Sequence, residues 1–179
     1  MNPAERAVND PLRIRRLLRD VPDFPTPGVV FKDISPLLAD GAAFDAVIAA
    51  LAEGSGDADI VAGIEARGFL IAGALARQLG CGLLPVRKSG KLPPPTLRRA
   101  YDLEYGSAEI EVPAGLLAGK RAMVVDDVLA TGGTMRAAAD LLGEAGATVV
   151  GLAVIIELAF LDGRAALTGL PELKSLVTL

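Results

Sequence analysis

The chain contains no histidine and only one cysteine, Cys81. Without histidine, catalysis by a histidine base and the common metal cages built from histidine and cysteine are excluded. A lone cysteine cannot form a disulfide within the chain. Any acid–base chemistry must therefore be carried out by carboxylates, tyrosine or lysine.

Long apolar runs and an excess of positive charge are also missing. No apolar run approaches the roughly 20 residues that span a bilayer. The first 20 residues mix acids with bases and lack the continuous apolar stretch of a secretory signal, so we expect a cytoplasmic protein without membrane contact. The formal net charge of −4 argues against a nucleic-acid partner, although a local basic cluster can still hold a small anion.

The 179 residues, 51% of them hydrophobic, suffice for one domain with a substantial core. We therefore predict a single domain over residues 1–179, with an N-terminal segment over about residues 1–40. The periodicity of residues 10–21 predicts a short amphipathic helix. Four prolines within residues 22–38 argue against a regular helix there and predict a loop with a short strand near residues 29–31.

From residue 41 onward, helical and strand patterns alternate along the chain. Helices are predicted over residues 41–51, 68–79 and 135–144, and strands over residues 59–64, 82–88, 107–112, 121–128 and 148–158. The proline-rich residues between 89 and 106 are predicted to be a loop. Because several of the strands are apolar on both faces, the pattern predicts an α/β fold with a mainly parallel central sheet flanked by helices on both sides.

The segment VVDDVLATGGT (124–134) carries the most specific signal. Asp126 and Asp127 follow an apolar strand, and ligands of open α/β sheets bind at the carboxyl ends of strands. The ATGGT turn that follows offers backbone N–H groups and a helix N-terminus, which favour a phosphate, while the carboxylates can accept hydrogen bonds from sugar hydroxyls. The segment therefore predicts a site for a ribose 5-phosphate. The alternative is that the acids cap a loop and the glycines form an ordinary turn, but the full spacing favours the site.

Other nucleotide motifs are absent, since the sequence contains neither GxxxxGK[ST] nor a GxGxxG at a strand-to-helix turn. Arg67 lies between a predicted strand and a predicted helix, which is a second anion-binding position, although a structural salt bridge is the alternative. Arg87, Lys88 and Lys91 adjoin a glycine- and proline-rich segment. Such a cluster is usually a solvated surface, but a phosphate-contacting loop fits this setting better.

The segment VVDDVLATGGT resembles the phosphoribosyl-pyrophosphate motif of the type I phosphoribosyltransferases. The segments FPTPGVVFKDISPLL, GIEARGFLIAG, VRKSGKLPPPT and YDLEYGSAEIE are similar, in the same order, to segments of the adenine-specific members of that family. The resemblance covers nearly the whole chain. It implies the type I phosphoribosyltransferase fold, with the N-terminal segment forming a small hood over the base site.

The resemblance also implies roles for individual residues. Asp126 and Asp127 would hold the ribose hydroxyls. The residues that would cradle the 5-phosphate are Ala130, Thr131, Gly132, Gly133 and Thr134, and those of the pyrophosphate site are Glu65, Ala66, Arg67, Gly68, Arg87, Lys88 and Lys91. Some of the pyrophosphate contacts are expected to cross the interface of a homodimer.

For the chemistry, Glu104 matches the carboxylate on the family's catalytic loop, beside Tyr105, although an exposed loop acid is the alternative. Phe31 would stack on adenine, with Val30 and Lys32 nearby and Leu158 on the other face, and a core phenylalanine is the alternative for Phe31. Mg²⁺ is expected on the substrate's pyrophosphate, with no metal ligand required from the protein.

Two positions depart from the family pattern. Lys32 stands where many members carry arginine, so a bidentate contact cannot form there. The run Pro93–Pro95 is stiffer than the family's usual KLPGPT, which predicts slower loop closure.

The resemblance thus implies an enzyme that makes AMP and pyrophosphate from adenine and phosphoribosyl pyrophosphate, with inversion at the anomeric carbon. A phosphoribosyltransferase for another purine or a pyrimidine would share the phosphate site and differ in the base pocket. A non-catalytic sensor of phosphoribosyl pyrophosphate that binds DNA would need a basic face and an added module of roughly 60 residues. The sequence shows neither feature.

Overall fold

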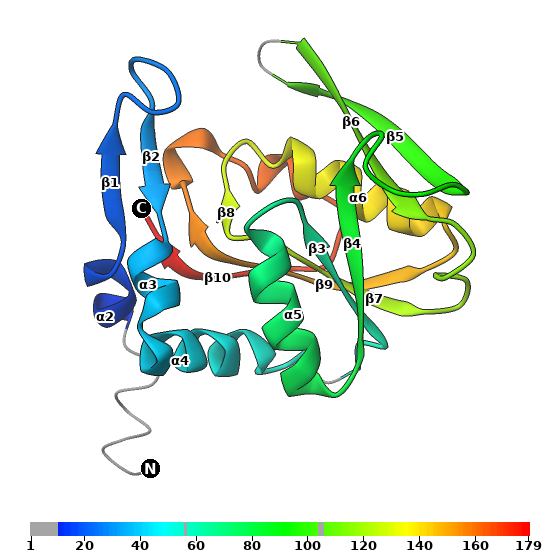
Figure 1. Ribbon diagram of the computed structural model, residues 1–179, viewed down its shortest axis with the longest axis horizontal. Coiled ribbons are helices and arrows are strands. Elements are labelled where there is room, and N and C mark those ends of the chain that lie inside the picture. Colours follow the sequence, from blue (N-terminus) through cyan, green and yellow to red (C-terminus); the bar gives the residue numbers. More distant parts are fainter. Residues whose placement is uncertain (1–10, 56, 104–105) are drawn as a thin grey trace. The chain divides into compact units, whose positions relative to one another are not determined.

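The computed structural model describes residues 11–55, 57–103 and 106–179 (Figure 1). The chain divides into two compact units, Met1–Ala50 and Leu51–Leu179. Both the single domain and the placement of the hood over a base site stay predictions. None of the helices in the described ranges has the length and apolarity that crossing a membrane requires.

The first unit contains a two-stranded antiparallel sheet and short helices. Its elements are α2 (Pro11–Arg16), β1 (Arg19–Pro22), β2 (Val30–Asp33), α3 (Ser35–Ala39) and the start of α4 (Gly41–Ala52). The helix predicted over residues 10–21 is too long, because residues 19–22 pair with residues 30–33 instead. Arg19 supports this pairing through its Nη2, 2.6 Å from Asp33 Oδ2. Strand pairing thus overrides the local helical pattern.

Proline placement explains a second difference from the sequence prediction. Residues 35–39 form a helix although Pro36 lies within them. Proline is tolerated in the first helical turn, where its missing N–H has no partner to lose. The prediction that the prolines exclude a regular helix was therefore wrong for this short segment, while the predicted strand is β2.

The second unit is built on one mixed sheet. Its elements are β3 (Ile60–Ile64), α5 (Gly68–Leu79), β4 (Gly82–Lys88), β5 (Thr96–Leu103), β6 (Gly106–Pro113), β7 (Arg121–Val125), β8 (Val128–Leu129), α6 (Gly133–Glu144), β9 (Thr148–Glu157) and β10 (Leu173–Thr178), with 3-10 turns at Ala159–Leu161 and Ala165–Leu167. The strand order is β10-β9-β7-β3-β4-β6-β5. The strands from β10 to β4 are parallel, and β6 and β5 add to them in antiparallel fashion. The prediction of a mainly parallel sheet is confirmed.

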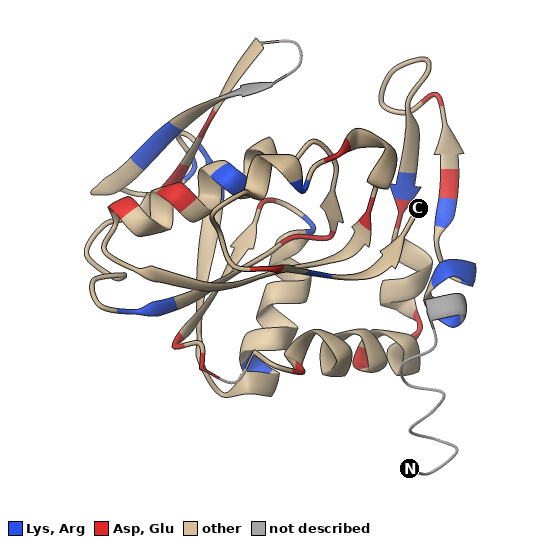
Figure 2. Ribbon diagram, turned by 180° about the vertical axis from the view of Figure 1, so that it is seen from behind, with Lys and Arg blue, Asp and Glu red and all other residues tan. Residues whose placement is uncertain are grey.

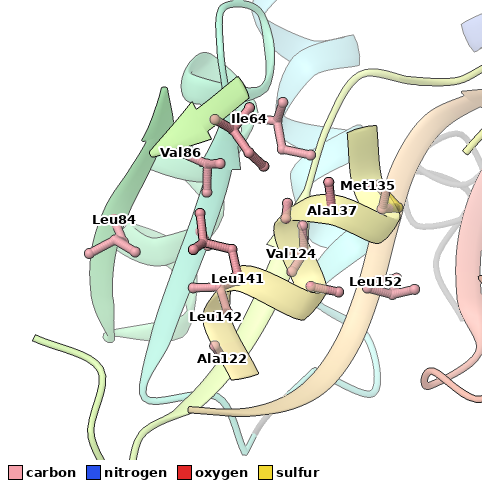
Figure 3. Close-up of a cluster of buried hydrophobic side chains, with 14 of the residues drawn as sticks. Ile64, Leu84, Val86, Ala122, Val124, Met135, Ala137, Leu141, Leu142 and Leu152 are labelled. Carbon is pink, nitrogen blue, oxygen red and sulfur yellow. The ribbon is translucent and has the colours of Figure 1, made fainter. Parts of the chain in front are cut away.

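Helices α5 and α6 cover opposite faces of this sheet. Successive side chains of a strand point to opposite faces. On β3, Ala62 packs in the buried cluster formed with α6, whereas the next residue, Gly63, faces α5 so closely that an added Cβ would lie 2.7 Å from Ala72 Cβ. Figure 3 shows the side of the sheet that packs against α6, with Ala137, Leu141 and Leu142 of α6 directed at the strands.

The hairpin of β5 and β6 is the main element that the sequence did not predict in full. Strand β6 was predicted, but β5 lies in the stretch predicted as a loop, and it pairs with β6 along its whole length, from Thr96 opposite Pro113 to Leu103 opposite Gly106. Arg99 of β5 joins the hairpin to α6 by ion pairs with Asp140, at 2.9 Å, and with Glu144. Figure 2 shows these acidic segments of α6 beside the basic segment of the hairpin.

Candidate active site

A cavity of about 510 Å³ lies in the second unit at the carboxyl ends of β3, β4 and β7. Strand ends supply its floor, and the β5–β6 hairpin supplies a wall. The residues that line it are Ile64, Glu65, Ala66, Arg67, Val86, Lys88, Tyr101, Ala108, Ile110, Asp126, Asp127, Val128, Ala130 and Thr134. The edge at which the sequence predicted a ligand therefore holds a real cavity.

Two adjacent carboxylates stand at the end of β7. The Asp126 N–H donates to Ala153 O at 3.1 Å, and the Asp127 N–H donates to Asp126 Oδ1 at 2.9 Å. Burial, reinforced by the neighbouring charge of Asp127, raises the pKa of Asp126 well above its ordinary value. Burial also raises the pKa of Asp127, although the charge of Arg67 opposes the rise. The pair therefore resists full ionisation in the ligand-free chain.

One oxygen of this pair is poorly satisfied. Asp127 Oδ2 lies 2.8 Å from Arg67 Nη2, which is an ion-pair distance. Nevertheless, this buried oxygen accepts no hydrogen bond of good geometry within the described part of the chain. Buried polar atoms are rarely left in this condition. A hydroxyl donor of a ligand in the cavity would satisfy the oxygen.

The TGGT turn forms a second, smaller hollow of about 80 Å³, which Asp126 and residues 128–135 line. Gly132 caps α6 with a left-handed φ of +82°, and no side chain caps the helix, so its first-turn N–H groups face an anion site without a competing acceptor. A Cβ on Gly132 would lie 2.3 Å from Gly163 O, so only glycine fits here. The Thr134 hydroxyl donates to Tyr101 Oη at 3.3 Å.

The N-terminus of α5 packs directly against the acid pair. Arg67 is its N-cap residue, and the helix begins at Gly68. A Cβ on Gly68 would lie 2.9 Å from Val125 O and 3.0 Å from Asp126 Oδ1, so a larger residue would push the helix away from the site. Arg67 is thereby held beside the carboxylates and lines the cavity.

In the predicted basic cluster, one cation lines the cavity and the other two form ion pairs with Glu65. Lys88, at the end of β4, lines the cavity. Arg87 Nε and Lys91 Nζ instead lie 3.4 Å and 2.5 Å from the carboxylate of Glu65.

The remaining predicted residues fall into two groups. Glu104 and Tyr105 lie outside the described residues. Val30, Phe31 and Lys32 belong to β2 of the first unit, where the Phe31 ring meets Phe24 edge-on at 5.2 Å and Lys32 Nζ lies 2.8 Å from Asp20 Oδ1.

Leu158, by contrast, follows β9 in the second unit, and its N–H donates to Leu129 O at 2.9 Å. The roles of these residues toward adenine stay predictions.

Sequence reasoning missed the wall of the cavity that the hairpin provides. Tyr101 comes from the unpredicted strand β5, while Ala108 and Ile110 come from β6. The alternation in SAEIEV carried a usable signal, because Ala108 and Ile110 are two residues apart and so share one face of a strand. Nothing in the sequence pairs Tyr101 with them, since that depends on the hairpin register.

The comparisons with known proteins identify the family. Residues 34–167 match the model of the phosphoribosyl transferase domain, and the sheet order, acid pair and glycine turn are those of a type I phosphoribosyltransferase.

The chain is 63% identical over 157 residues to the adenine phosphoribosyltransferase of Kineococcus radiotolerans. The matched region spans 86% of this chain and 84% of that protein. This chain belongs to the adenine phosphoribosyltransferase family.

Solved structures agree with this assignment. The adenine phosphoribosyltransferase of Thermoanaerobacter pseudethanolicus superposes with a TM-score of 0.91 at 44% identity, covering 95% of this chain and 100% of that one. The APRTase of Giardia lamblia, solved in complex with 9-deazaadenine, gives a TM-score of 0.90 at 36% identity, covering 95% of this chain and 98% of that one.

Proposed function

We propose that this chain transfers the 5-phosphoribosyl group of phosphoribosyl pyrophosphate to adenine, forming AMP and pyrophosphate in purine salvage. One observation carries the proposal: the acid pair, the start of the TGGT helix and Arg67 all border a single cavity. The cavity thus combines acceptors for ribose hydroxyls with two separate positions for phosphate. The family membership supports adenine as the base, and the 9-deazaadenine complex of the Giardia relative is consistent with it.

The substrate's phosphate and ribose account for the residues of the TGGT side. The 5-phosphate would bind residues 130–134, where the N-terminus of α6 offers uncapped N–H groups. The ribose hydroxyls would donate to Asp126 and Asp127. The buried Asp127 Oδ2, which lacks a hydrogen bond from the described residues, would gain one. Binding would therefore relieve an unfavourable feature of the ligand-free site.

The reaction exchanges one bond at the anomeric carbon for another. A ring nitrogen of adenine forms a bond to that carbon as the bond to the pyrophosphate oxygen breaks, with inversion, and pyrophosphate leaves with the bonding electron pair. Glu104, beside Tyr105, accepts the proton that adenine loses. Arg67 and Lys88 stabilise the charge that develops on the departing oxygens.

Magnesium fits the site as a companion of the substrate. Within the described residues, no group of three or more histidine, cysteine, aspartate or glutamate side chains could hold a metal ion. The donors that are present, Asp126 and Asp127, are oxygen ligands suited to Mg²⁺, and Mg²⁺ typically takes one or two carboxylates together with substrate phosphates. When bound, the ion neutralises the charge of pyrophosphate as it leaves.

We further propose a base site in which Phe31 stacks on adenine, Val30 offers backbone hydrogen bonds, Lys32 lies nearby and Leu158 covers the other face of the base. These assignments come from the family resemblance. Replacing Phe31 by alanine tests the central one, because the loss of stacking is expected to raise KM for adenine and leave KM for phosphoribosyl pyrophosphate nearly unchanged.

We propose a cytoplasmic homodimer. Two exposed leucines support the dimer, since Leu70 of α5 and Leu83 of β4 leave 55% and 50% of their surfaces exposed. Large exposed apolar side chains near one another often mark an interface. Light scattering after size exclusion measures the mass directly and decides between monomer and dimer.

The experiment that tests the proposed reaction offers adenine, hypoxanthine, guanine, xanthine and orotate separately, each with phosphoribosyl pyrophosphate and Mg²⁺. Strong preference for adenine supports the proposal. Activity with a different base alone keeps the phosphate site and overturns the base site. Binding of phosphoribosyl pyrophosphate with no turnover of any base supports the sensor instead.

A further inference from the structure

Glu65 occupies an unusual place in the proposed pyrophosphate site. It follows β3, its N–H donates to Val86 O at 2.9 Å, and only 10% of its side chain is exposed. The carboxylate lines the cavity, where an anionic ligand is to bind. A carboxylate at this position repels an anionic ligand, so its presence indicates that it has another task.

The contacts of Glu65 indicate that task. Its Oε1 accepts a hydrogen bond from Lys91 Nζ at 2.5 Å. Its Oε2 accepts one from the Lys88 N–H at 3.0 Å and lies 3.4 Å from Arg87 Nε. Burial opposes ionisation, but the contacts with Lys91 and Lys88 outweigh it and lower the pKa of Glu65 below its ordinary value. Glu65 is therefore an ionised carboxylate that holds the side chains of Lys91 and Arg87 next to it.

The loop that carries Lys91 is also held in place by contacts that do not involve Glu65. A different carboxylate, the fully buried Glu111, accepts the N–H groups of Lys91 and Leu92 at 2.7 Å and 2.8 Å. Arg98 Nε, 3.1 Å from Glu111, completes that arrangement. Glu111 thus fixes the loop backbone independently of Glu65, and Arg87 Nη1 adds a hydrogen bond to Lys91 O at 3.0 Å. The Lys91 side chain and Arg87 Nε can therefore leave Glu65 without unfolding the loop.

We propose that Glu65 is a positioning residue that occupies the pyrophosphate site in place of the ligand: it holds Arg87 and Lys91 in the ligand-free chain and gives them up to pyrophosphate. This inference rests on the proposed function, which supplies pyrophosphate as the ligand. Pyrophosphate offers more charge and more acceptor oxygens than one carboxylate, so it can displace Glu65. When pyrophosphate leaves, Glu65 takes the cations back and speeds its release.

The test is calorimetric binding of magnesium pyrophosphate to the full-length wild type, Glu65→Gln and Glu109→Gln. The side chain of Glu109 on β6 is exposed, and within the described residues no hydrogen bond or ion pair joins it to Arg87, Lys88 or Lys91, so its substitution makes the same change of charge away from these cations. We expect Glu65→Gln to bind pyrophosphate roughly tenfold more tightly, because a repelling charge is gone and two cations are released. Glu109→Gln is expected to bind like the wild type.

Steady-state kinetics supply the second reading. Glu65→Gln is expected to lower KM for phosphoribosyl pyrophosphate, to strengthen inhibition by pyrophosphate and to lower kcat, since release becomes slower. Pyrophosphate binding by Glu65→Gln that is equal to or weaker than that of the wild type overturns the proposal and leaves Glu65 a structural residue.

Should Glu65→Gln not fold, Glu65→Asp takes its place. Its shorter side chain keeps the charge but draws back from Lys91, so a smaller tightening is expected, and unchanged or weaker binding again overturns the proposal. A wild type that binds no pyrophosphate overturns the proposed function instead, so the two failures are distinguishable.

Discussion

Replacing Gly132 by alanine tests whether the phosphate turn depends on glycine for two separate reasons. A left-handed backbone costs a residue with a Cβ about 1–2 kcal/mol. In addition, the new Cβ would lie 2.3 Å from Gly163 O and 2.9 Å from Ala166 Cβ, so backbone must move. Forcing a methyl group into a packed site costs about 1–3 kcal/mol. The expected loss in the free energy of unfolding is therefore about 2–5 kcal/mol.

Gly169 provides a matched control for this substitution. Its φ of +85° nearly equals the +82° of Gly132, but nothing lies within 4 Å of a Cβ added there. Gly169→Ala should therefore lose only the backbone part, about 1–2 kcal/mol. Urea denaturation measures both losses. Equal losses for the two variants would refute the steric argument.

The activity of the same variants gives an independent check. A reacting group displaced by about 1 Å can lose on the order of a hundredfold in rate. Gly132→Ala should therefore lower kcat/KM for phosphoribosyl pyrophosphate by about ten- to a hundredfold, whereas Gly169→Ala should stay within about twofold of the wild type.

Three further predictions concern the acids and the hairpin. Asp126→Asn keeps the acceptor for the Asp127 N–H but removes a carboxyl group whose pKa is raised in the folded chain. The loss of the carboxylate should abolish transfer, and the loss of a buried charge should stabilise the fold at neutral pH. Since a raised pKa means that the folded wild type binds the extra proton, wild-type stability should fall as the pH rises from 3.8 through the raised value. Urea denaturation of Asp126→Asn along that pH series should show a smaller fall, because Asp127 is then the remaining member of the pair with a raised pKa, and a fall as large as that of the wild type would contradict the assignment. Glu104→Gln should lower kcat far more than substrate affinity, as single-turnover kinetics can show, and an unchanged kcat would remove Glu104 from the mechanism. Arg99→Ala breaks the ion pairs with α6 at a site that is one-third exposed, so it should cost less than about 1 kcal/mol in urea denaturation, and a larger loss would mean that the hairpin depends on them.

The sequence predicted the parallel part of the sheet well because its strands are apolar on both faces and its helices are long. The predicted helix at residues 68–79 matches α5 residue for residue. Strand β5 was missed because it carries no continuous apolar run, and its pairing with β6 is antiparallel, unlike the parallel strands that the strand–helix–strand pattern predicts. Strand β1 was missed because a helical pattern in residues 10–21 competes with pairing to β2, which only tertiary structure reveals.

For part of the site, the sequence predicted that the acid pair and Arg67 lie together, but not which side chains form ion pairs with one another. Asp126, Asp127 and Arg67 line one cavity, as the position of strand ends in an α/β sheet requires. That Arg67 pairs with Asp127, and that Glu65 binds two of the three clustered cations, depends on side-chain geometry across separate loops. Sequence spacing contains no information on that pairing.

The buried acid pair also has a consequence for how long the protein survives in a cell. A ligand that binds only the folded chain raises its stability by about 2.7 kcal/mol when present at a hundred times its Kd. Here hydrogen bonds from the ligand's hydroxyls would also offset part of the cost of ionising two neighbouring buried carboxylates, whose pKa values are raised. Degradation acts on the small unfolded fraction, so a change of 1–2 kcal/mol can alter abundance several-fold. The level of the protein is therefore expected to rise and fall with the supply of its own sugar phosphate substrate, without any change in its synthesis.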